Sequence, residues 1–347
     1  LGPPLPRRRA EPGAVMASDR IERHQVWIYL AAILAGLGTG HGLPAAAAVF
    51  EALLWPAIAL LLFATFVQVP LLHLREAFAD RRFALANLLG NFLLLPLLVW
   101  GLLGLLPPEP ALRLGVALVL LVPCTDWFIT FTRLGGGDAA RAIAISPLNL
   151  VLQLLLLPLY LWWLLPEAGL AAAFEPLRLL PAAAALLGLP LLAALLAERW
   201  IEARPERVSL RVLLAAWPVP LLALVVFLIA AAQADAVRGA GMALLAVLPA
   251  FLGFLLAAPL LAWGLARLFG LGPAAGRTLA YGLGTRNSFV VLPFALALPA
   301  GWEASALVIV LQSLVELLGM LLYLWGLPRW GFPATQATPP DGGRPRP

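Results

Sequence analysis

Two polar runs each break a long apolar stretch of this chain near its middle: Pro123-Cys124-Thr125-Asp126-Trp127-Phe128 and Gly284-Thr285-Arg286-Asn287-Ser288-Phe289. The first run contains a lone Asp and the second a lone Arg. Charged side chains are costly within apolar spans, and those that occur there usually mark a functional site. Unwound backbone at membrane depth is tolerated only where it is buried in protein or lines a cavity. The two runs are therefore the candidate functional site.

The composition indicates an integral membrane protein. Of the 347 residues, 62% are hydrophobic and 12% are charged, whereas about half of a soluble domain is apolar and about a quarter is charged. The apolar runs suit the roughly 20 residues that a membrane-spanning helix needs, and they lack the alternating polarity of barrel strands. The sequence thus predicts an all-α membrane protein.

Ten transmembrane helices are predicted. Their many Pro and Gly residues would break helices in water, but neighbouring helices in a membrane bundle satisfy the freed backbone groups. Segments 1–25 and 328–347 are rich in Pro and Arg, and we expect them to be disordered. The predicted spans are residues 26–41, 52–74, 83–106, 111–133, 139–165, 176–197, 209–232, 239–269, 278–299 and 302–327.

The basic residues predict the orientation in the membrane. All 23 are arginines; with a cytoplasmic N-terminus, 19 fall on cytoplasmic segments, three fall outside and Arg286 lies within the membrane. This bias follows the positive-inside rule. We therefore expect a multi-pass protein of the inner membrane with both termini in the cytoplasm. The net charge of +5 then reflects topology and not nucleic-acid binding.

Two short motifs recur along the chain at the same spacing. The sequence of 96–102, Pro-Leu-Leu-Val-Trp-Gly-Leu, returns with one change at 259–265, and Leu-Tyr-Leu-Trp at 159–162 returns at 322–325. Both offsets are 163. The chain then consists of two five-helix repeats, 26–165 and 176–327, and an odd number of helices inverts the second copy. Inverted repeats with broken helices are typical of secondary transporters.

The repeat makes the two broken helices the fourth helix of each half, and we expect them to cross at mid-membrane. Asp126 and Arg286 are 160 residues apart, and we attribute the difference from 163 to a small deletion. The last helix of each half carries a polar pair on one face: Asn149 with Gln153, and Gln312 with Glu316. We expect both faces to look into one central cavity and to support the site.

These features resemble the bile acid:sodium symporter superfamily, and specifically its arsenite-efflux permease branch. The resemblance rests on the Pro123-Cys124-Thr125 turn, the Gly-Thr-Arg-Asn-Ser-Phe turn and the ten helices in inverted halves, and it extends from about Trp27 to Trp330. It implies a panel domain and a core domain, with the fourth and ninth helices unwound where they cross.

The chain departs from the sodium-coupled members at one motif. Their ninth helix reads Glu-x-x-x-Gln-Asn, and the acid helps to hold sodium. The matching positions here are Gly282, Arg286 and Asn287, so the acid is missing and a cation replaces the amide. A hard cation requires several oxygen ligands. We therefore expect coupling to protons instead of sodium, with Arg286 as a built-in substitute for the ion.

Cys124 matches the functional cysteine of the arsenite branch, although the ninth-helix Glu of that branch is replaced here by Val290. Trivalent arsenic binds thiolates, so a single thiol could select the substrate and still release it. The alternative is that Cys124 is a buried small hydrophobe, as free cysteines often are. The polar residues Thr125, Thr285, Asn287 and Ser288 are candidate ligands for a neutral hydroxylated substrate.

Asp126 and Glu316 are the candidate coupling residues. Asp126 and Arg286 could pair across the crossing, since two opposite charges neutralise each other at lower cost than either alone; the pair could equally be structural. Burial of Glu316 favours its protonated form, as a proton carrier requires. The alternative for Glu316 is a carboxyl group hydrogen-bonded to Asn149 or Gln153.

Motifs of an enzyme are missing from the sequence. It contains no phosphate loop and no H-E-x-x-H, the three histidines lie near predicted helix ends, and the polar residues assemble no nucleophile with a base. We expect no catalytic activity, no cofactor and no bound metal. One cysteine cannot form an internal disulfide.

The sequence therefore predicts a secondary transporter that exports arsenite or antimonite by proton exchange, as a monomer or homodimer in the lipid bilayer. The alternative is cation- or proton-coupled uptake of an organic anion, such as a bile-acid-like molecule or a small carboxylate. In that case Arg286 would pair with the carboxylate, for which its guanidinium fork is well suited.

Overall fold

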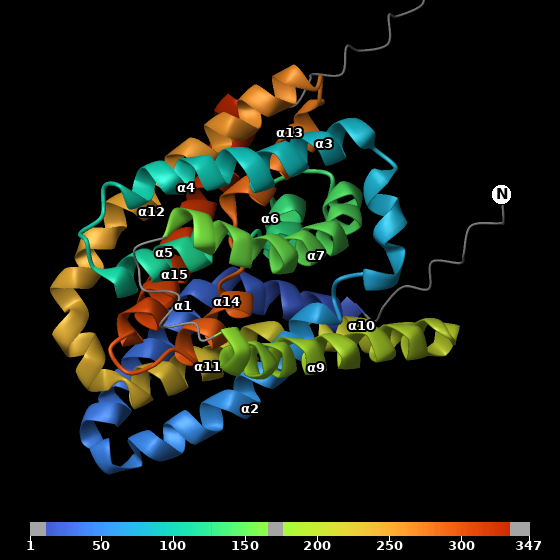
Figure 1. Cartoon of the computed structure of the whole chain (residues 1–347). Helices are drawn as coiled ribbons and strands as arrows, with labels where there is room; N and C mark the ends of the chain where they lie inside the picture. Colours follow the sequence, from blue (N-terminus) through green and yellow to red (C-terminus); the bar gives the residue numbers. More distant parts are fainter. Residues whose placement is uncertain (1–11, 126, 166–175, 334–347) are drawn as a thin grey trace, which may run out of the picture.

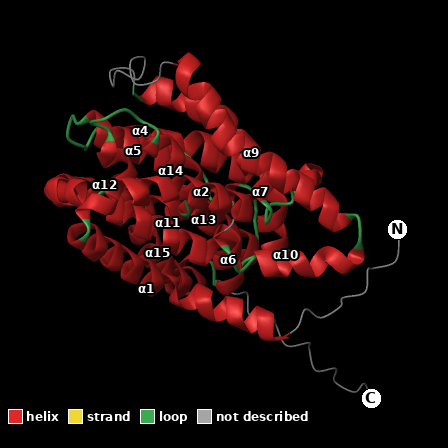
Figure 2. Cartoon of the chain, turned by 90° about the horizontal axis from the view of Figure 1, so that it is seen from below, coloured by secondary structure: helices red, strands yellow, loops and turns green. Residues whose placement is uncertain are grey.

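The computed structural model describes residues 12–125, 127–165 and 176–333, and these residues form helices joined by short loops (Figure 2). The prediction of an all-α protein is confirmed. Five helical segments among them are long and apolar enough to cross a membrane: Pro44–Phe66, Arg81–Leu103, Ala139–Leu164, Ala243–Leu268 and Glu303–Gly331.

The first half of the chain contains seven α-helices: α1 (Pro12–Gly42), α2 (Ala47–Phe66), α3 (Arg81–Leu89), α4 (Leu95–Leu103), α5 (Pro110–Leu120), α6 (Trp127–Leu134) and α7 (Ala139–Leu164). Short 3₁₀ segments η1 (Pro44–Ala46) and η2 (Leu71–Phe78) flank α2. A single π-helical segment, η3 (Gly90–Leu94), joins α3 to α4.

The described part of the second half contains α9 (Pro176–Glu202), α10 (Val208–Leu214), α11 (Pro218–Ala232), α12 (Ala234–Leu268), α13 (Pro273–Gly284), α14 (Ser288–Leu296) and α15 (Glu303–Gly326). The 3₁₀ segment η4 (Pro205–Arg207) precedes α10, and the π-helical segment η5 (Leu327–Gly331) follows α15.

Most of the predicted spans coincide with observed helices, and the differences have local causes. The span predicted at 52–74 ends early, because α2 stops at Phe66 and the chain turns before η2. Pro70, in this turn, has no backbone N–H to donate to a helix. The span predicted at 209–232 is divided into α10 and α11 just before Pro218.

The predicted disorder of the end segments is corrected where the structure describes them. Residues 12–25 are the first turns of α1, which opens with Pro12, a residue pre-organised for the start of a helix. Residues 328–333 pack against the bundle: the Phe332 side chain is 7% exposed, and its carbonyl accepts a 2.9 Å hydrogen bond from Arg277 Nε. Residues 1–11 and 334–347 lie outside the described residues.

The helices form two layers (Figure 1). We call α1, α2, α9 and α11 the panel, because α11 packs against α1 and α2, and α2 packs against α9. We call α3 to α7 and α12 to α15 the core, in which α12 packs against α13 and α15, and α15 against α5 and α14. The segment η2 joins the panel to the core. This division matches the two domains that the family resemblance implies.

Small residues bring α1 and α11 into close contact within the panel. A Cβ atom built on Gly36 would lie 2.4 Å from the carbonyl oxygen of Phe227, and one built on Gly40 would lie 2.4 Å from that of Ala231. Gly36 and Gly40 therefore form a G-x-x-x-G motif, which lets helix backbones approach closely in membranes. Gly38 lies between them and has open space around its Cβ position.

Gly36→Ala is expected to lower the free energy of unfolding by about 1–3 kcal/mol, the usual cost of overpacking a tight contact. Gly38→Ala is the matched control on the same helix, and it should be neutral or slightly stabilising, since Ala is the better helix former. Thermal unfolding of the detergent-purified protein, followed by tryptophan fluorescence, measures both. Equal melting temperatures for the two variants would contradict the close packing.

Candidate functional site at the helix crossing

Four helix ends meet where the two broken helices cross. Helices α5 and α13 end at this point, at Leu120 and Gly284, and α6 and α14 begin there. The segments between them are extended and pair antiparallel, with Pro123 opposite Arg286. Backbone N–H groups on both strands donate across the pair: Cys124 N to Thr285 O (3.2 Å) and Asn287 N to Val122 O (2.8 Å). The broken backbones thus satisfy part of each other's hydrogen bonding.

The crossing keeps the offset of 163, which corrects the deletion inferred from the sequence. Pro123 and Arg286, which face each other, differ by 163, and the two backbone hydrogen bonds exchange with each other under the same shift. Pro123, and not Asp126, is therefore the repeat counterpart of Arg286. Outside the crossing, Tyr160 Oη donates to Phe92 O and Tyr323 Oη donates to Leu255 O, and both members of each pair again differ by 163.

Arg286 is the charged centre of the crossing, and its side chain is 2% exposed. Its guanidinium donates to three backbone carbonyls, those of Leu120 (3.3 Å), Gly282 (3.0 Å) and Leu283 (2.8 Å). These carbonyls belong to the last turns of α5 and α13, whose final C=O groups lack helical partners and carry partial negative charge. One cation therefore caps two half-helices.

A chain of amides extends from Arg286 into the core. Arg286 Nη2 donates to Asn91 Oδ1 (2.9 Å), Asn91 Nδ2 to Asn87 Oδ1 (3.0 Å), and Asn87 Nδ2 to Asn149 Oδ1 (2.7 Å). All three asparagines are buried. Asn91 lies in η3, and π-helical turns of this kind are frequent at functional sites. Sequence reasoning missed Asn87 and Asn91, although two amides four residues apart in an apolar helix follow the same pattern as Asn149 and Gln153.

Glu316 contacts the crossing from the side of α15 and is 1% exposed. Its Oε2 accepts hydrogen bonds from the backbone N–H of Arg286 (2.8 Å) and from Gln312 Nε2 (2.7 Å). Gln312 Oε1 in turn accepts from the hydroxyl of Ser288 at 3.0 Å. Glu316 thus contacts its own polar pair and the crossing backbone, and not Asn149 or Gln153 as the alternative interpretation supposed.

Gln153, the repeat counterpart of Glu316, is bonded differently. It is 2% exposed, yet neither of its amide atoms has a hydrogen-bond partner among the described residues. Glu316 accepts the backbone N–H of Arg286, and the residue equivalent to Arg286 is Pro123, which has no N–H to donate. The repeat is therefore asymmetric at this contact, with an engaged carboxylate on one side and an unpaired amide on the other.

The remaining predicted ligands lie at the crossing. Asn287 caps α14, since its Oδ1 accepts from Val290 N at 3.3 Å, and its Nδ2 donates to Thr125 Oγ1 at 3.3 Å. The hydroxyl of Thr285 donates to Tyr281 O at 2.8 Å. Together with Ser288 and Cys124 these residues are at most 4% exposed. The crossing is therefore tightly packed, and the side chains expected to face a central cavity contact protein.

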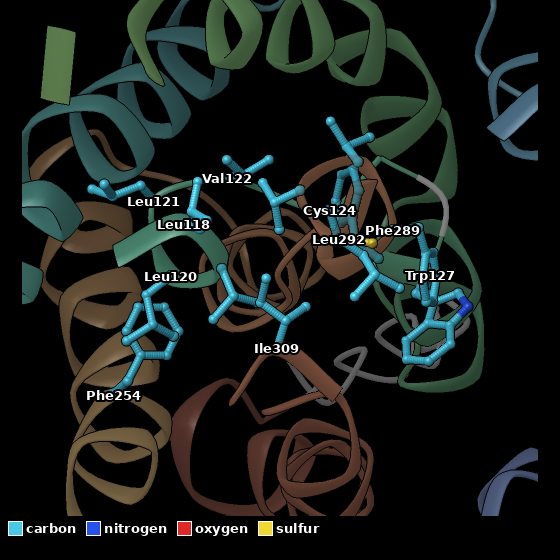
Figure 3. Packing of buried hydrophobic residues seen from close by; sticks show 14 of the residues in the cluster. Leu118, Leu120, Leu121, Val122, Cys124, Trp127, Phe254, Phe289, Leu292 and Ile309 are labelled. Atoms are coloured by element: carbon cyan, nitrogen blue, oxygen red, sulfur yellow. The ribbon is translucent and has the colours of Figure 1, made fainter. Parts of the chain in front are cut away.

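Cys124 lies between this polar centre and an apolar cluster. Figure 3 shows its sulfur near Leu292 and Phe289, with Trp127 beside them. The Trp127 ring stacks on Tyr29 of α1 at a centroid distance of 6.0 Å and meets Phe289 edge to face at 5.2 Å. These aromatic contacts join the panel to the crossing. Asp126, the predicted coupling residue, lies outside the described residues.

The chemistry of the described crossing residues is that of amides, hydroxyls, one thiol, one carboxyl group and one guanidinium. A comparison with family models places this site in context. The model of the sodium bile acid symporter family matches residues 55–240, just over half of the chain. The chain belongs to this family. A comparison with curated proteins found no match.

Family membership establishes the general activity. Members of the sodium bile acid symporter family are ion-coupled secondary transporters of small substrates and not enzymes. The chain is thus a multi-pass membrane transporter, and the prediction that it has no catalytic activity is confirmed. The resemblance is confirmed at the level of the family, while the match does not extend to the arsenite-efflux branch.

Arg286→Met is expected to lower the free energy of unfolding by about 3–5 kcal/mol, as removing one partner of a buried charged network does. The loss arises because the three carbonyls and Asn91 are left without donors. The control is Arg267→Gln, since Arg267 is exposed and stacks on Trp263; its effect should stay below about 1 kcal/mol. Chemical denaturation of both purified variants measures the difference, and a stability of Arg286→Met equal to wild type would contradict the capping role.

Proposed function

We propose that this member of the sodium bile acid symporter family exports arsenite or antimonite in exchange for protons and does not use sodium. The observation that carries the proposal is that a buried thiol, Cys124, and a fixed cation, Arg286, share one helix crossing. The thiol accounts for the substrate, and the cation accounts for the change of coupling ion.

The proposed topology is ten spans in two inverted repeats, 26–165 and 176–327, crossing the inner membrane with both termini in the cytoplasm. Three observations support it. The arginine distribution follows the positive-inside rule, the broken helices cross in antiparallel pairing, and Tyr160 and Tyr323 make the same hydrogen bond in the two halves. Movement of the core against the panel would carry the crossing from one side of the membrane to the other, in a monomer or within a homodimer.

Arg286 supports sodium-independent coupling through the nature of its partners. All four atoms that accept hydrogen bonds from its guanidinium are oxygens, three of them backbone carbonyls at half-helix C-termini. Carbonyl and amide oxygens are also the ligands that hard cations prefer, and in transporters such helix ends coordinate the coupling ion. The guanidinium supplies a permanent positive charge to the same kind of oxygen cluster.

Glu316 is the proposed proton carrier, since it is the ionisable member of its repeat pair. As a carboxylate it accepts hydrogen bonds from Arg286 N and Gln312. Protonation converts one oxygen into a donor and removes the charge, which weakens both of these bonds. Proton binding would thereby loosen α15 from the crossing, and this is a change that a transport cycle can use. Asp126 remains the second proposed coupling residue on sequence grounds.

Cys124 is the proposed substrate contact. Trivalent arsenic and antimony are soft, thiophilic acceptors, and one thiolate gives a contact that can be broken again during transport. The hydroxyls and amides of Thr125, Thr285, Asn287 and Ser288 lie at the same crossing and can hydrogen-bond the hydroxyl groups of a neutral arsenite or antimonite molecule.

Uptake of an organic anion is the second candidate, favoured by one observation. Helices α6 and α14 both begin at the crossing, and the positive ends of half-helices attract anionic substrates in other transporters. The original role for Arg286 in this alternative is less favourable, because its guanidinium already donates to four oxygens. An anion would therefore be held by the helix N-termini and the nearby hydroxyls.

Expression of the chain in an arsenite-sensitive host should restore growth on arsenite, and Cys124→Ser should remove that benefit because oxygen is a poorer ligand for arsenic than sulfur. Growth curves across arsenite concentrations, with membrane levels checked by immunoblot, measure the effect. Ser313→Ala is the control, since Ser313 is buried in α15 and bonds only locally to Ile309 O. Growth no better than that of the empty host, together with accumulation of a carboxylate by vesicles, would favour the second candidate.

Everted vesicles should take up arsenite when their interior is made acidic, with equal rates in sodium and potassium buffers. Glu316→Gln should remove the response to the pH gradient, because an amide cannot carry the proton. Gly282→Glu combined with Arg286→Gln should introduce a sodium response, since it restores the family motif; the Cβ of residue 282 would make ordinary contacts of 3.4 Å or more. A sodium-stimulated rate in the wild type would refute the proposed role of Arg286.

A further inference from the structure

Three metal-ligating side chains meet at the joint between the panel and the core, away from the crossing. His73 lies in η2, the segment that links α2 to α3, and Glu198 and Glu202 lie four residues apart near the end of α9. His73 Nδ1 is 3.8 Å from Glu198 Oε1 and 3.8 Å from Glu202 Oε1. The three potential ligand atoms all lie within 4.8 Å of one another.

The surroundings hold these side chains toward a common point. Glu198 is 1% exposed, and its Oε2 accepts a hydrogen bond from the backbone N–H of Leu72 at 3.3 Å. That bond leaves Oε1 on the side of His73. Hydrogen bonds of this kind orient the ligands of a metal and are part of most metal sites. His73 Nδ1 is itself buried and has no hydrogen-bond partner within the described part of the chain.

The donor set indicates which metal would fit. One imidazole nitrogen and two carboxylate oxygens are ligands that Zn²⁺ accepts, in tetrahedral sites with metal–ligand distances of about 2.0–2.2 Å. Such distances correspond to about 3.4 Å between ligand atoms, and the observed 3.8 Å is close to this value. Glu202 is 34% exposed, so its side chain has room to close the remaining gap. The imidazole disfavours Mg²⁺ and Ca²⁺, which prefer oxygen ligands alone.

We propose that His73, Glu198 and Glu202 form a binding site for a divalent transition metal, with Zn²⁺ the preferred ion and water as a fourth ligand. The site connects η2 to α9. Because η2 also packs against α7 of the core, a bound metal ties the connection between the two layers to a panel helix. Metal binding therefore stabilises this joint and restrains the movement of core against panel. The sequence analysis expected no metal, since 125 residues separate His73 from Glu198.

The test uses the full-length chain in detergent, stripped with a chelator and then equilibrated with zinc chloride. The expected result is one Zn²⁺ per chain by atomic absorption and a rise in melting temperature that grows with zinc concentration. His73→Ala and Glu202→Gln should each weaken binding by about tenfold or more. Both residues lie near the surface, so these variants are expected to fold, and their melting temperature without zinc verifies it.

Two control variants identify the site. His41→Ala removes an exposed histidine at the other end of the panel, where its Nδ1 contacts Leu37 O, and Cys124→Ser removes the thiol; both should bind zinc like the wild type. Binding that persists in His73→Ala and Glu202→Gln would indicate an adventitious ion only and overturn the proposal, as would a wild type that binds no zinc. The measurement involves no transport substrate, so its outcome is independent of the proposed export of arsenite.

Discussion

The bonding of Arg286 is the constraint on which the rest of the core depends. Breaking two membrane helices leaves carbonyls at the ends of α5 and α13 and amide groups at the starts of α6 and α14, and a membrane offers no water to satisfy them. Antiparallel pairing of the two extended segments satisfies some of these groups. The guanidinium satisfies carbonyls of both half-helices and joins them to the amide chain of α3 and α7. The break is thereby made compatible with a closely packed interior.

The internal repeat is preserved in its frame and altered at its centre. Tyr160 and Tyr323 make equivalent bonds to the backbone, and the crossing strands pair at the same offset of 163. At the centre, however, Pro123 faces Arg286, and Gln153 stands where the other half has Glu316. Symmetric backbones therefore hold an asymmetric set of side chains. A transporter needs such asymmetry, because one substrate and one coupling ion must be bound by a site that the fold has built twice.

Much of the framework could be predicted from the sequence, because it follows from hydrophobic length and local breakers. The long apolar runs, the interruptions at 123–128 and 284–289 and the recurring motifs identified the helices, the broken pair and the repeat. The errors occurred where sequence distance conceals contact. Disorder was expected for residues 12–25 and 328–333 from their Pro and Arg content, but a membrane-proximal helix extends through the first, and Arg277 binds the second.

The sequence by itself determined that the chain is a helical membrane protein with two interrupted helices, since apolar length and periodicity report the solvent around each segment. Only the tertiary structure decided which partners the polar residues take. Arg286 binds helix-end carbonyls and Asn91, Glu316 binds the Arg286 backbone, and His73 meets two glutamates of α9. The physical reason is that hydrogen bonds and metal–ligand contacts extend over a few ångströms only, so they depend on how distant segments pack and not on the order of residues along the chain.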